Sequence, residues 1–398
     1  MNGPDMAAPF RDAPALPLAG CRVVERSRTV AGAYAGRLLA TLGADVLVLE
    51  PPGGSALRAA PPSLPGKDAG SALFTYLACG KRSLVSDPGQ DGYDEDVERE
   101  LGRADILIDD TPTAERTSTG WSETAIADRF PSLIHVSVLP FGATGPKSSW
   151  QGEEINLIHA SGEGFLLPNG LSNELFPERA PLKIYGHFAN YQGGCVAALS
   201  ALAAWWAKSA HGGQQVDVSV QDAMLLCGAF ALQRLGDGSL EHRASRSFKY
   251  GGVFQARDGF IELLTLEDRQ WKGLVQLLGN PAWALDPALD DGLERSRRGG
   301  EINSHIRKWM AIRDADDIVY NAQQLGVPAA KYRTPQDVFQ GEHENSRGLF
   351  APLTSDGGEA PSVLIAPYRF RLSPLGPLAA PPELDNARPE PRSEEAIR

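Results

Sequence analysis

The sequence predicts an α/β protein with a large lobe built on a mostly parallel sheet and a smaller lobe that contains a β-hairpin. Three observations support this prediction. Short apolar strands alternate with helical segments from Cys21 to about Phe141, mainly helical sequence follows over 152–209, and two alternating runs flank a turn within 252–266. Strands that alternate with helices favour parallel pairing, with helices on both faces of the sheet.

The first part of the chain contains five strand-like segments, expected at 21–26, 45–50, 82–87, 104–110 and 133–142. Helices are expected between them at 31–44, 71–80, 94–102 and 122–130. Gly43 is placed to end the first of these helices, and Ser122 to cap the last. Such a sheet binds its ligands at the carboxyl ends of the strands.

The second part begins with an alternating strand at 214–220 and a helix at 221–235. The turn Arg257-Asp258-Gly259 joins the two runs of the expected hairpin at 252–266. Helices are expected at 267–278 and 300–324, and the proline-rich end from 374 onward returns to loop.

Composition excludes several classes of partner. The 398 residues carry 38 Lys and Arg against 50 Asp and Glu, a net charge of −12, which argues against nucleic acid or an anionic membrane. The apolar run 195–207 is shorter than the roughly 20 residues that span a bilayer. Four separated cysteines in apolar surroundings are expected to be buried thiols, and a cytoplasmic location is predicted.

Several motifs are candidates for chemistry, each with an alternative explanation. Residues 186–194 (GHFANYQGG) form a glycine-bounded loop before the long apolar run and offer Asn190. Glu153 and Glu154 are either acid–base groups or acids that favour a helix start. Lys81 and Arg82 either contact phosphate or stand at a helix end. The histidines have no metal-ligand spacing, so no metal is expected.

An ordered set of segments resembles the family III CoA-transferases, whose relatives include the α-methylacyl-CoA racemases. The set comprises 17–54, GKRSLV (80–85), ADILIDD (104–110), FGATGP (141–146), GEEINLIHASG (152–162), GGQQVDVSVQDA (212–223), GVPAAKYRTPQDV (326–338) and RGLF (347–350). The resemblance covers roughly residues 15–375. It implies a Rossmann-like large domain, a small α+β domain, and two chains interlocked like linked rings.

The resemblance also implies a division of the chain and a ligand. The expected parts are a flexible end at 1–16, the first part of the large CoA-binding domain at 17–200, a connecting helix and small domain at 201–325, a return to the large domain at 326–375, and a flexible tail at 376–398. Coenzyme A is the implied ligand, as part of an acyl-CoA substrate, with a small carboxylic acid as its acceptor. The implied CoA-binding residues are Thr29, Val30, Leu77, Lys81, Arg82, Asp110, Thr111 and Arg116.

In these transferases an aspartate attacks the acyl-CoA thioester, and the matching position here is Asn190. An amide lacks the charge and most of the nucleophilicity of a carboxylate. Three alternatives follow: a transferase in which Glu153 or Glu154 takes over part of the chemistry, a CoA-binding subunit paired with an aspartate-bearing homologue, or an acyl-CoA isomerase that uses Glu153. An engineered Asp-to-Asn change would give the same sequence. The acyl group, and the choice between a homodimer and a heterodimer, stay open at this point.

Overall fold

The computed structural model describes residues 15–65, 70–86, 95–167, 176–227, 250–354, 361–376 and 378–387. Residues 1–14 of the flexible end predicted at 1–16 fall outside the described residues, as do 377 and 388–398 of the tail predicted at 376–398 and the end of the helix predicted at 221–235. The chain divides into two compact units. The first comprises residues 1–164, 183–230 and 345–398, and the second comprises 165–182 and 231–344.

The first unit is built on a six-stranded sheet in which every neighbouring pair of strands is parallel. The strand order is β3-β2-β1-β4-β5-β6. The strands are β1 (Arg22–Arg26), β2 (Asp45–Glu50), β3 (Arg82–Val85), β4 (Ile106–Asp109), β5 (Ile134–Leu139) and β6 (Gln215–Ser219). The predicted parallel sheet is confirmed. The order reverses between β1 and β4, so the carboxyl ends of these two strands flank the crevice in which such sheets bind ligands.

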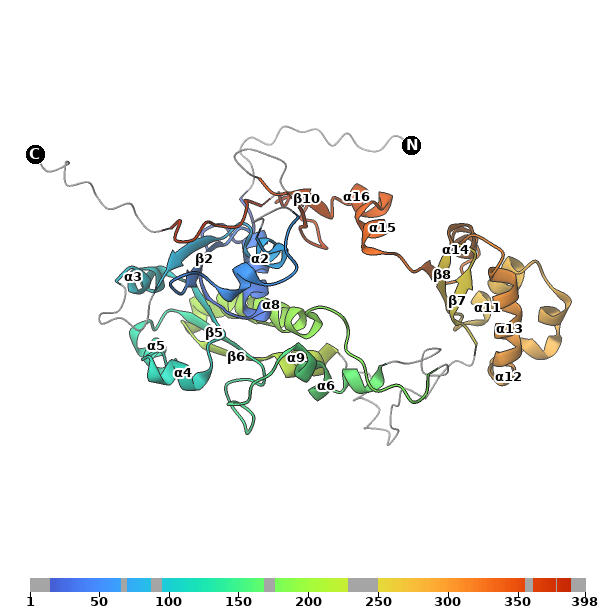
Figure 1. The fold of residues 1–398 in the computed structure, drawn as a ribbon, viewed down its shortest axis with the longest axis horizontal. Helices are drawn as coiled ribbons and strands as arrows, with labels where there is room; N and C mark the ends of the chain where they lie inside the picture. Colours follow the sequence, from blue (N-terminus) through green and yellow to red (C-terminus); the bar gives the residue numbers. More distant parts are fainter. Residues whose placement is uncertain are drawn as a thin grey trace, which may run out of the picture. The chain divides into compact units, whose positions relative to one another are not determined.

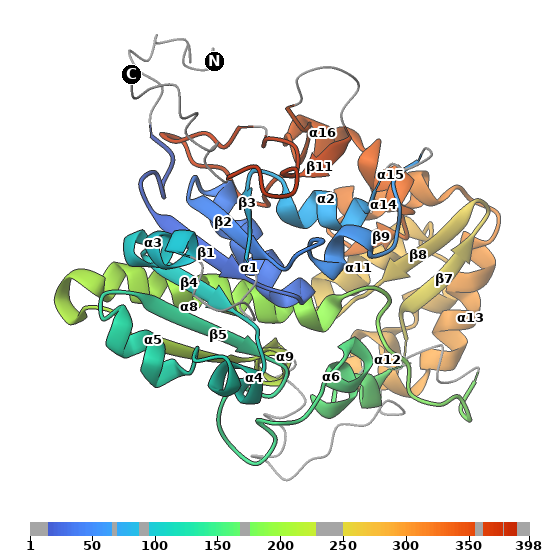
Figure 2. The ribbon, with the colours of Figure 1, turned by 60° about the vertical axis from the view of Figure 1, so that its left-hand side comes forward.

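Helices cover both faces of this sheet (Figure 1, Figure 2). Those of the first unit are α1 (Val30–Thr41), α2 (Ala72–Ala78), α3 (Glu95–Arg103), α4 (Thr113–Ser118), α5 (Glu123–Arg129), α6 (Glu154–Ala160), α8 (Phe188–His211), α9 (Val220–Cys227), α16 (Glu342–Ser346, shared with the second unit) and the 3₁₀ turn η1 (Ala56–Ala59). Alternate strand residues separate the two faces: Val23 packs with α1 and α8, whereas Val24 packs with α3 and α5.

The long helix α8 lies against α1 through small residues. Its buried positions are Ala189, Gly193, Gly194, Ala197, Ala198, Ala201 and Ala204. A Cβ atom at Gly194 would stand 2.7 Å from the backbone oxygen of Ala31. Because these glycines and alanines add so little bulk, the two helix backbones approach closely. The first turn of α8 is thereby held beside the first turn of α1.

The second unit contains a three-stranded antiparallel sheet in the order β7-β8-β9. Its strands are β7 (Gly252–Ala256), β8 (Gly259–Leu263) and β9 (Ala329–Lys331), so the predicted hairpin gains a third strand. The helices are α11 (Asp268–Leu277), α12 (Gly292–Arg297), α13 (Gly299–Met310), α14 (Ala315–Gln324) and α15 (Pro335–Phe339), with 3₁₀ turns η2 (Glu163–Leu166), η4 (Ala282–Leu285) and η5 (Pro287–Asp290). The helix predicted at 300–324 is therefore two helices.

The end of the chain returns to the first unit. The strands β10 (Phe350–Pro352) and β11 (Ser362–Leu364) form an antiparallel pair there. The buried Arg37 of α1 donates from Nη2 to the backbone oxygen of Leu364 at 3.1 Å and from Nε to that of Tyr76 at 2.9 Å. These hydrogen bonds attach the returning segment to the helix that begins at the ligand edge of the sheet.

The prediction of four buried cysteines is half wrong. Cys21 and Cys79 are buried, whereas Cys195 on α8 and Cys227 on α9 are exposed. Apolar neighbours in the sequence do not reveal which face of a helix a residue occupies, and Cys195 lies off the small-residue face that packs on α1. None of the helices in the described part of the chain has the length and apolarity needed to cross a membrane.

The close approach of α8 and α1 gives the first prediction. Gly194→Ala should lower the free energy of unfolding by about 1–3 kcal/mol, because the new methyl group meets a backbone oxygen that cannot move without displacing α1. The matched control is Gly102→Ala in α3, where no atom lies within 4 Å of the added Cβ and a small gain in stability is expected. Urea unfolding of both variants measures the difference. Equal stabilities would contradict the close packing.

Candidate functional site

The start of α8 holds Asn190, and a carboxylate from α6 lies against it. Glu154 accepts hydrogen bonds from the backbone N–H groups of Ala189 (2.7 Å) and Asn190 (3.1 Å). The side-chain amide of Asn190 donates a third hydrogen bond, from Nδ2 to Oε2 of Glu154, at 2.7 Å. The N-cap residue His187 makes no side-chain cap, so Glu154 supplies the acceptor that the first N–H groups of α8 need.

Glu153 and Glu154 therefore occupy different environments. Glu154 is buried, and both of its oxygens accept N–H groups of α8. Glu153 is exposed and is the N-cap residue of α6, where its backbone N–H donates to Oδ1 of Asn156 at 2.9 Å. Glu154 is thus suited to orient the amide of Asn190, and Glu153 belongs to the boundary of a surface helix.

The first turn of α1 lies next to this group. Tyr191 packs edge-on against Tyr34 of α1, with ring centroids 4.7 Å apart. Burial raises the pKa of Tyr191 to about 12, so its phenol stays protonated at neutral pH. Helix α1, which packs against the helix that carries Asn190, begins with the half-buried N-cap residue Thr29 and the buried Val30.

Asp110, which directly follows β4, occupies the N-terminus of α1. Its carboxylate accepts hydrogen bonds from the backbone N–H groups of Arg28 (2.9 Å) and Thr29 (2.7 Å) and from the hydroxyl of Thr29 (2.6 Å). Burial raises the pKa of Asp110 to about 6, although these hydrogen bonds favour its charged form. In dinucleotide-binding sheets a phosphate takes the position at the start of this helix. Here a side chain of the protein fills it.

Arg116 and Thr111 are part of the interior next to Asp110. Arg116 is 1% exposed, and its guanidinium contacts the Asp109 carboxylate (Nε to Oδ2, 3.0 Å) and the Ser137 hydroxyl (2.8 Å). Burial opposes the charge of Asp109, but His135, Arg116 and Arg26 around it lower its pKa to about 2. Thr111 is fully buried, and its N–H donates to Asp109. Arg116 therefore forms a buried ion pair with Asp109 and does not line the crevice.

The structure gives Leu77, Lys81 and Arg82 partners within the protein. Leu77 is buried in the contact between α2 and α1. Lys81 is buried, with its amine 2.6 Å from Glu25 and 2.8 Å from the backbone oxygen of Ala33. Arg82 begins β3, at the opposite end of the sheet, where it pairs with Asp45 on the surface. Local sequence could not show these partners, since each lies more than 35 residues away.

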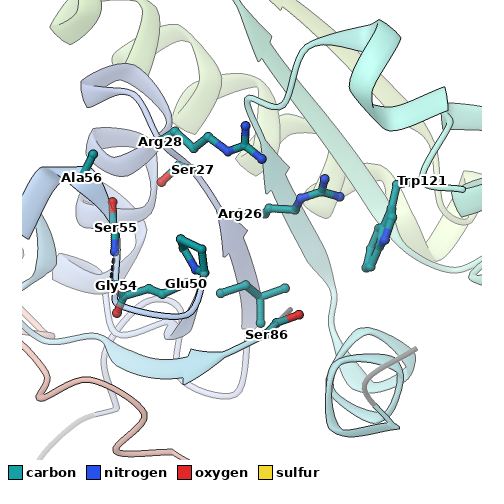
Figure 3. A pocket seen from close by; sticks show the side chains of 11 residues that line it. Arg26, Ser27, Arg28, Glu50, Gly54, Ser55, Ala56, Ser86 and Trp121 are labelled. Carbon is teal, nitrogen blue, oxygen red and sulfur yellow. Dashed lines mark hydrogen bonds between the residues drawn. The ribbon is translucent and has the colours of Figure 1, made fainter. Parts of the chain in front are cut away.

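A cavity of about 360 Å³ opens at the carboxyl ends of β1, β2 and β3 (Figure 3). Its lining residues are Arg26, Ser27, Arg28, Leu49, Glu50, Pro51, Gly54, Ser55, Ala56, Ser86 and Trp121. It adjoins the N-terminus of α1 through Ser27 and Arg28. Sequence reasoning missed Arg26 and Trp121. The available signal was a charged residue, Arg26, at the carboxyl end of a predicted strand.

No group of three His, Cys, Asp or Glu residues that could hold a metal ion occurs within the described ranges.

The candidate site consists of two neighbouring parts of the first unit. One is the Glu154–Asn190 pair at the start of α8, and the other is the cavity at the strand ends. The start of α1 lies between them.

Comparisons with known proteins agree with the resemblance found in the sequence. The model of CoA-transferase family III matches residues 18–388. A probable CoA-transferase from Mycobacterium tuberculosis is 31% identical over 325 residues, or 78% of this chain, but this chain spans only 39% of that protein's length. A succinyl-CoA:mesaconate CoA-transferase from Haloarcula hispanica is 28% identical, with 93% of this chain and 94% of the relative covered.

Two further comparisons bear on assembly and fold. The succinyl-CoA–L-malate CoA-transferase alpha subunit of Chloroflexus aurantiacus is 26% identical over 94% of this chain and 88% of that subunit. The crystal structure of a CAIB/BAIF family protein from Brucella suis superposes with a TM-score of 0.81 at 25% identity, covering 93% of this chain and 97% of that chain. The predicted α/β architecture is confirmed by this match.

The buried Asp110 predicts a pH dependence of stability. Its carboxyl has an ordinary pKa of 3.8 and a pKa of about 6 in the folded chain, so between these values the folded protein holds a proton that the unfolded chain has lost. The stability that Asp110 contributes is thus fully present below pH 3.8 and is lost as the pH rises through about 6. Urea unfolding of the wild type and Asp110→Asn between pH 4 and 7 should show the wild type losing stability relative to the variant. Parallel curves would contradict the raised pKa.

Proposed function

The chain belongs to CoA-transferase family III, and from this premise we propose that it takes part in moving CoA from an acyl-CoA to a small carboxylic acid as a CoA-binding subunit. A homologous chain supplies the reactive carboxylate. The observation that carries this proposal is the amide of Asn190, hydrogen-bonded to Glu154 at the position where the transferases resembled by the sequence have their aspartate.

The reaction requires a carboxylate that attacks the thioester carbonyl and releases CoA thiolate, leaving a mixed anhydride. The returning thiolate attacks the enzyme-side carbonyl of this anhydride, which forms an enzyme thioester and releases the donor acid as its carboxylate. The acceptor carboxylate then attacks the thioester and releases CoA thiolate again, and the thiolate attacks the acceptor-side carbonyl of the second anhydride, which gives the new acyl-CoA and frees the enzyme carboxylate. The oxygen of a neutral amide is a poor nucleophile for the first step. Moreover, the Nδ2 group of Asn190 is committed to Glu154, so the side chain is oriented as a hydrogen-bond donor towards that residue.

Glu154 is a weak substitute for the missing aspartate. The residue is 9% exposed, and its carboxylate accepts hydrogen bonds from three N–H groups. An attack through one of these oxygens would remove acceptors from the start of α8 and neutralise the charge that stabilises it. Glu153 is exposed and is the N-cap residue of helix α6. These contacts favour the subunit proposal over self-sufficient transfer or isomerisation.

Two observations support association with a second chain. Helix α8 exposes large apolar side chains, with Leu199 at 69% and Trp206 at 86% exposure. The relative from Chloroflexus aurantiacus is named as an alpha subunit. We propose either an interlocked heterodimer with an aspartate-bearing homologue or, in its absence, a homodimer of the same form.

The proposal predicts CoA binding without sustained transfer by the isolated chain. The chain is purified alone, CoA affinity is measured by calorimetry, and exchange is followed from succinyl-CoA to labelled dicarboxylic acids, since two relatives are named for succinyl-CoA. Micromolar CoA binding with negligible exchange, and exchange on addition of an aspartate-bearing homologue, is the expected result. Rapid turnover by the chain alone with a trapped glutamyl adduct would disprove the subunit role, and α-carbon deuteration without exchange would establish an isomerase.

Restoring the carboxylate gives a second prediction. Asn190→Asp should raise CoA exchange by the isolated chain at least about a hundredfold, equivalent to about 2.7 kcal/mol of barrier. It also places two carboxylates at hydrogen-bonding distance, which disfavours ionisation of both and moves the rise in activity to higher pH.

The matched control is the double variant Asn190→Asp/Glu154→Gln, which keeps one carboxylate and one amide in exchanged positions. Its activity should rise at lower pH than that of Asn190→Asp, since only one acid then titrates. Coincident pH profiles would show that the two side chains do not interact. No gain of activity in either variant would show that the site departs from that of an active transferase at more than residue 190.

A further inference from the structure

The imidazole of His187, directly before α8, takes no part in the contacts that hold the helix. His187 is the N-cap residue of α8, yet its side chain makes no capping hydrogen bond, and Glu154 accepts the N–H groups of Ala189 and Asn190 instead. The half-buried ring has no hydrogen-bond partner within the described part of the chain. Imidazole nitrogens donate and accept protons near neutral pH, so this ring is available to a ligand.

The place of His187 in the helix puts its side chain beside residue 190. The side chains of the N-cap residue and of the third helical residue are neighbours, which is the relation that a capping box uses. In α8 these two residues are His187 and Asn190. The His187 ring also stands at 90° to the ring of Tyr191, with centroids 6.4 Å apart. The imidazole therefore lies on the turn that carries the position of the transferase aspartate.

The backbone on both sides of His187 is held in place. Gly186 has a φ of +87°, in the left-handed region that favours glycine, and its carbonyl accepts a hydrogen bond from the ammonium of Lys183 at 3.2 Å. The N–H of Tyr191 donates to the carbonyl of His187 at 2.9 Å. A general base has to stay within hydrogen-bonding reach of the proton that it removes, and a fixed backbone meets this requirement.

The amide of Asn190 offers a second group for chemistry. It has two N–H bonds, and one of them donates to Oε2 of the buried Glu154 at 2.7 Å. This hydrogen bond fixes the plane of the amide and leaves the other N–H for an oxygen of a ligand. An N–H donor fixed before the reaction stabilises the oxyanion that forms when a carbonyl is attacked.

The replacement of a carboxylate by Asn190 changes which nucleophile the site can use. The amide oxygen is a poor nucleophile, whereas water attacks a thioester carbonyl when a base removes one of its protons. The oxygens of Glu154 are occupied by N–H groups of residues 189 and 190, and burial raises the pKa of Tyr191 to about 12. His187 is therefore the group on this turn that is suited to act as the base.

We propose that the chain hydrolyses acyl-CoA thioesters, with His187 as the general base and Asn190 as the oxyanion donor. His187 takes a proton from water as the water oxygen forms a bond to the thioester carbonyl carbon, and Asn190 donates to the resulting oxyanion. The C–S bond then breaks, and the imidazolium returns the proton to the CoA thiolate, which leaves the free acid and CoA thiol. The proposal rests on the function proposed above for the ligand, an acyl-CoA, and adds a reaction that needs no partner chain.

The test follows thiol release from acetyl-CoA, butyryl-CoA and succinyl-CoA by the full chain in water enriched in ¹⁸O, corrected for hydrolysis without protein. Thiol release with one ¹⁸O atom in each molecule of acid is the expected result in a single turnover. His187→Gln should slow the release at least about tenfold and leave CoA affinity unchanged. The matched control is His211→Gln, an exposed histidine in the last turn of the same helix, which should hydrolyse as the wild type does.

Two further variants separate a catalytic role from a structural one. His187→Gly keeps a residue that is tolerated at an N-cap, and added imidazole should restore its hydrolysis beyond the effect of imidazole on the thioester alone. Asn190→Ala should slow hydrolysis about a hundredfold, because the oxyanion loses its donor. A lower unfolding temperature of His187→Gly without rescue by imidazole would assign His187 to the structure of the loop and overturn its role as base.

The remaining outcomes distinguish hydrolysis from the proposed function. CoA binding by the wild type without thiol release would overturn hydrolysis and leave the function standing. Unchanged release by His187→Gln would overturn the role of His187. Deuterium entering the α-carbon from D₂O without thiol release would assign the imidazole to proton abstraction and overturn hydrolysis. Absence of CoA binding by the wild type would overturn both proposals.

Discussion

The candidate site depends on one constraint: the backbone N–H groups at the starts of α1 and α8 need hydrogen-bond acceptors from outside their own helix. The first N–H groups of a helix have no intrahelical acceptor and must find one elsewhere. At α8 Glu154 of α6 accepts the N–H groups of Ala189 and Asn190. At α1 the hydroxyl of the N-cap residue Thr29 accepts the N–H of Gly32, and Asp110 after β4 holds Thr29 through its N–H and hydroxyl groups. Both carboxylates are buried. Asp110 holds the start of α1 against the segment after β4, and Glu154 holds the start of α8 against α6.

This solution has a consequence for ligand binding. A helix N-terminus at the crevice of a parallel sheet normally attracts an anionic ligand. At α1 the protein's own carboxylate, that of Asp110, has taken that place. At α8 the internal carboxylate faces an amide. A carboxylate at residue 190 would face like charge there, whereas Asn190 adds a hydrogen bond to the same acceptor.

The close packing of α1 and α8 connects these two arrangements. With Gly194 against Ala31 and Tyr191 against Tyr34, the helix that carries Asn190 is held beside the helix that begins at the crevice. Glycine and alanine along α8 allow contact between the two helix backbones, which vary less in position than long side chains do.

The sequence by itself determined the α/β class, the alternation of strands and helices, the hairpin at 252–266 and the amide at residue 190, because these follow from local periodicity and from a motif read in order. Only the tertiary structure decided which charged residues remain available to a ligand. Lys81, Arg82 and Arg116 each have a neighbouring element as partner, whereas Arg26, placed in a strand that looked like core, faces a cavity. The pairing of a charge depends on residues distant in the chain, so only the folded structure shows it.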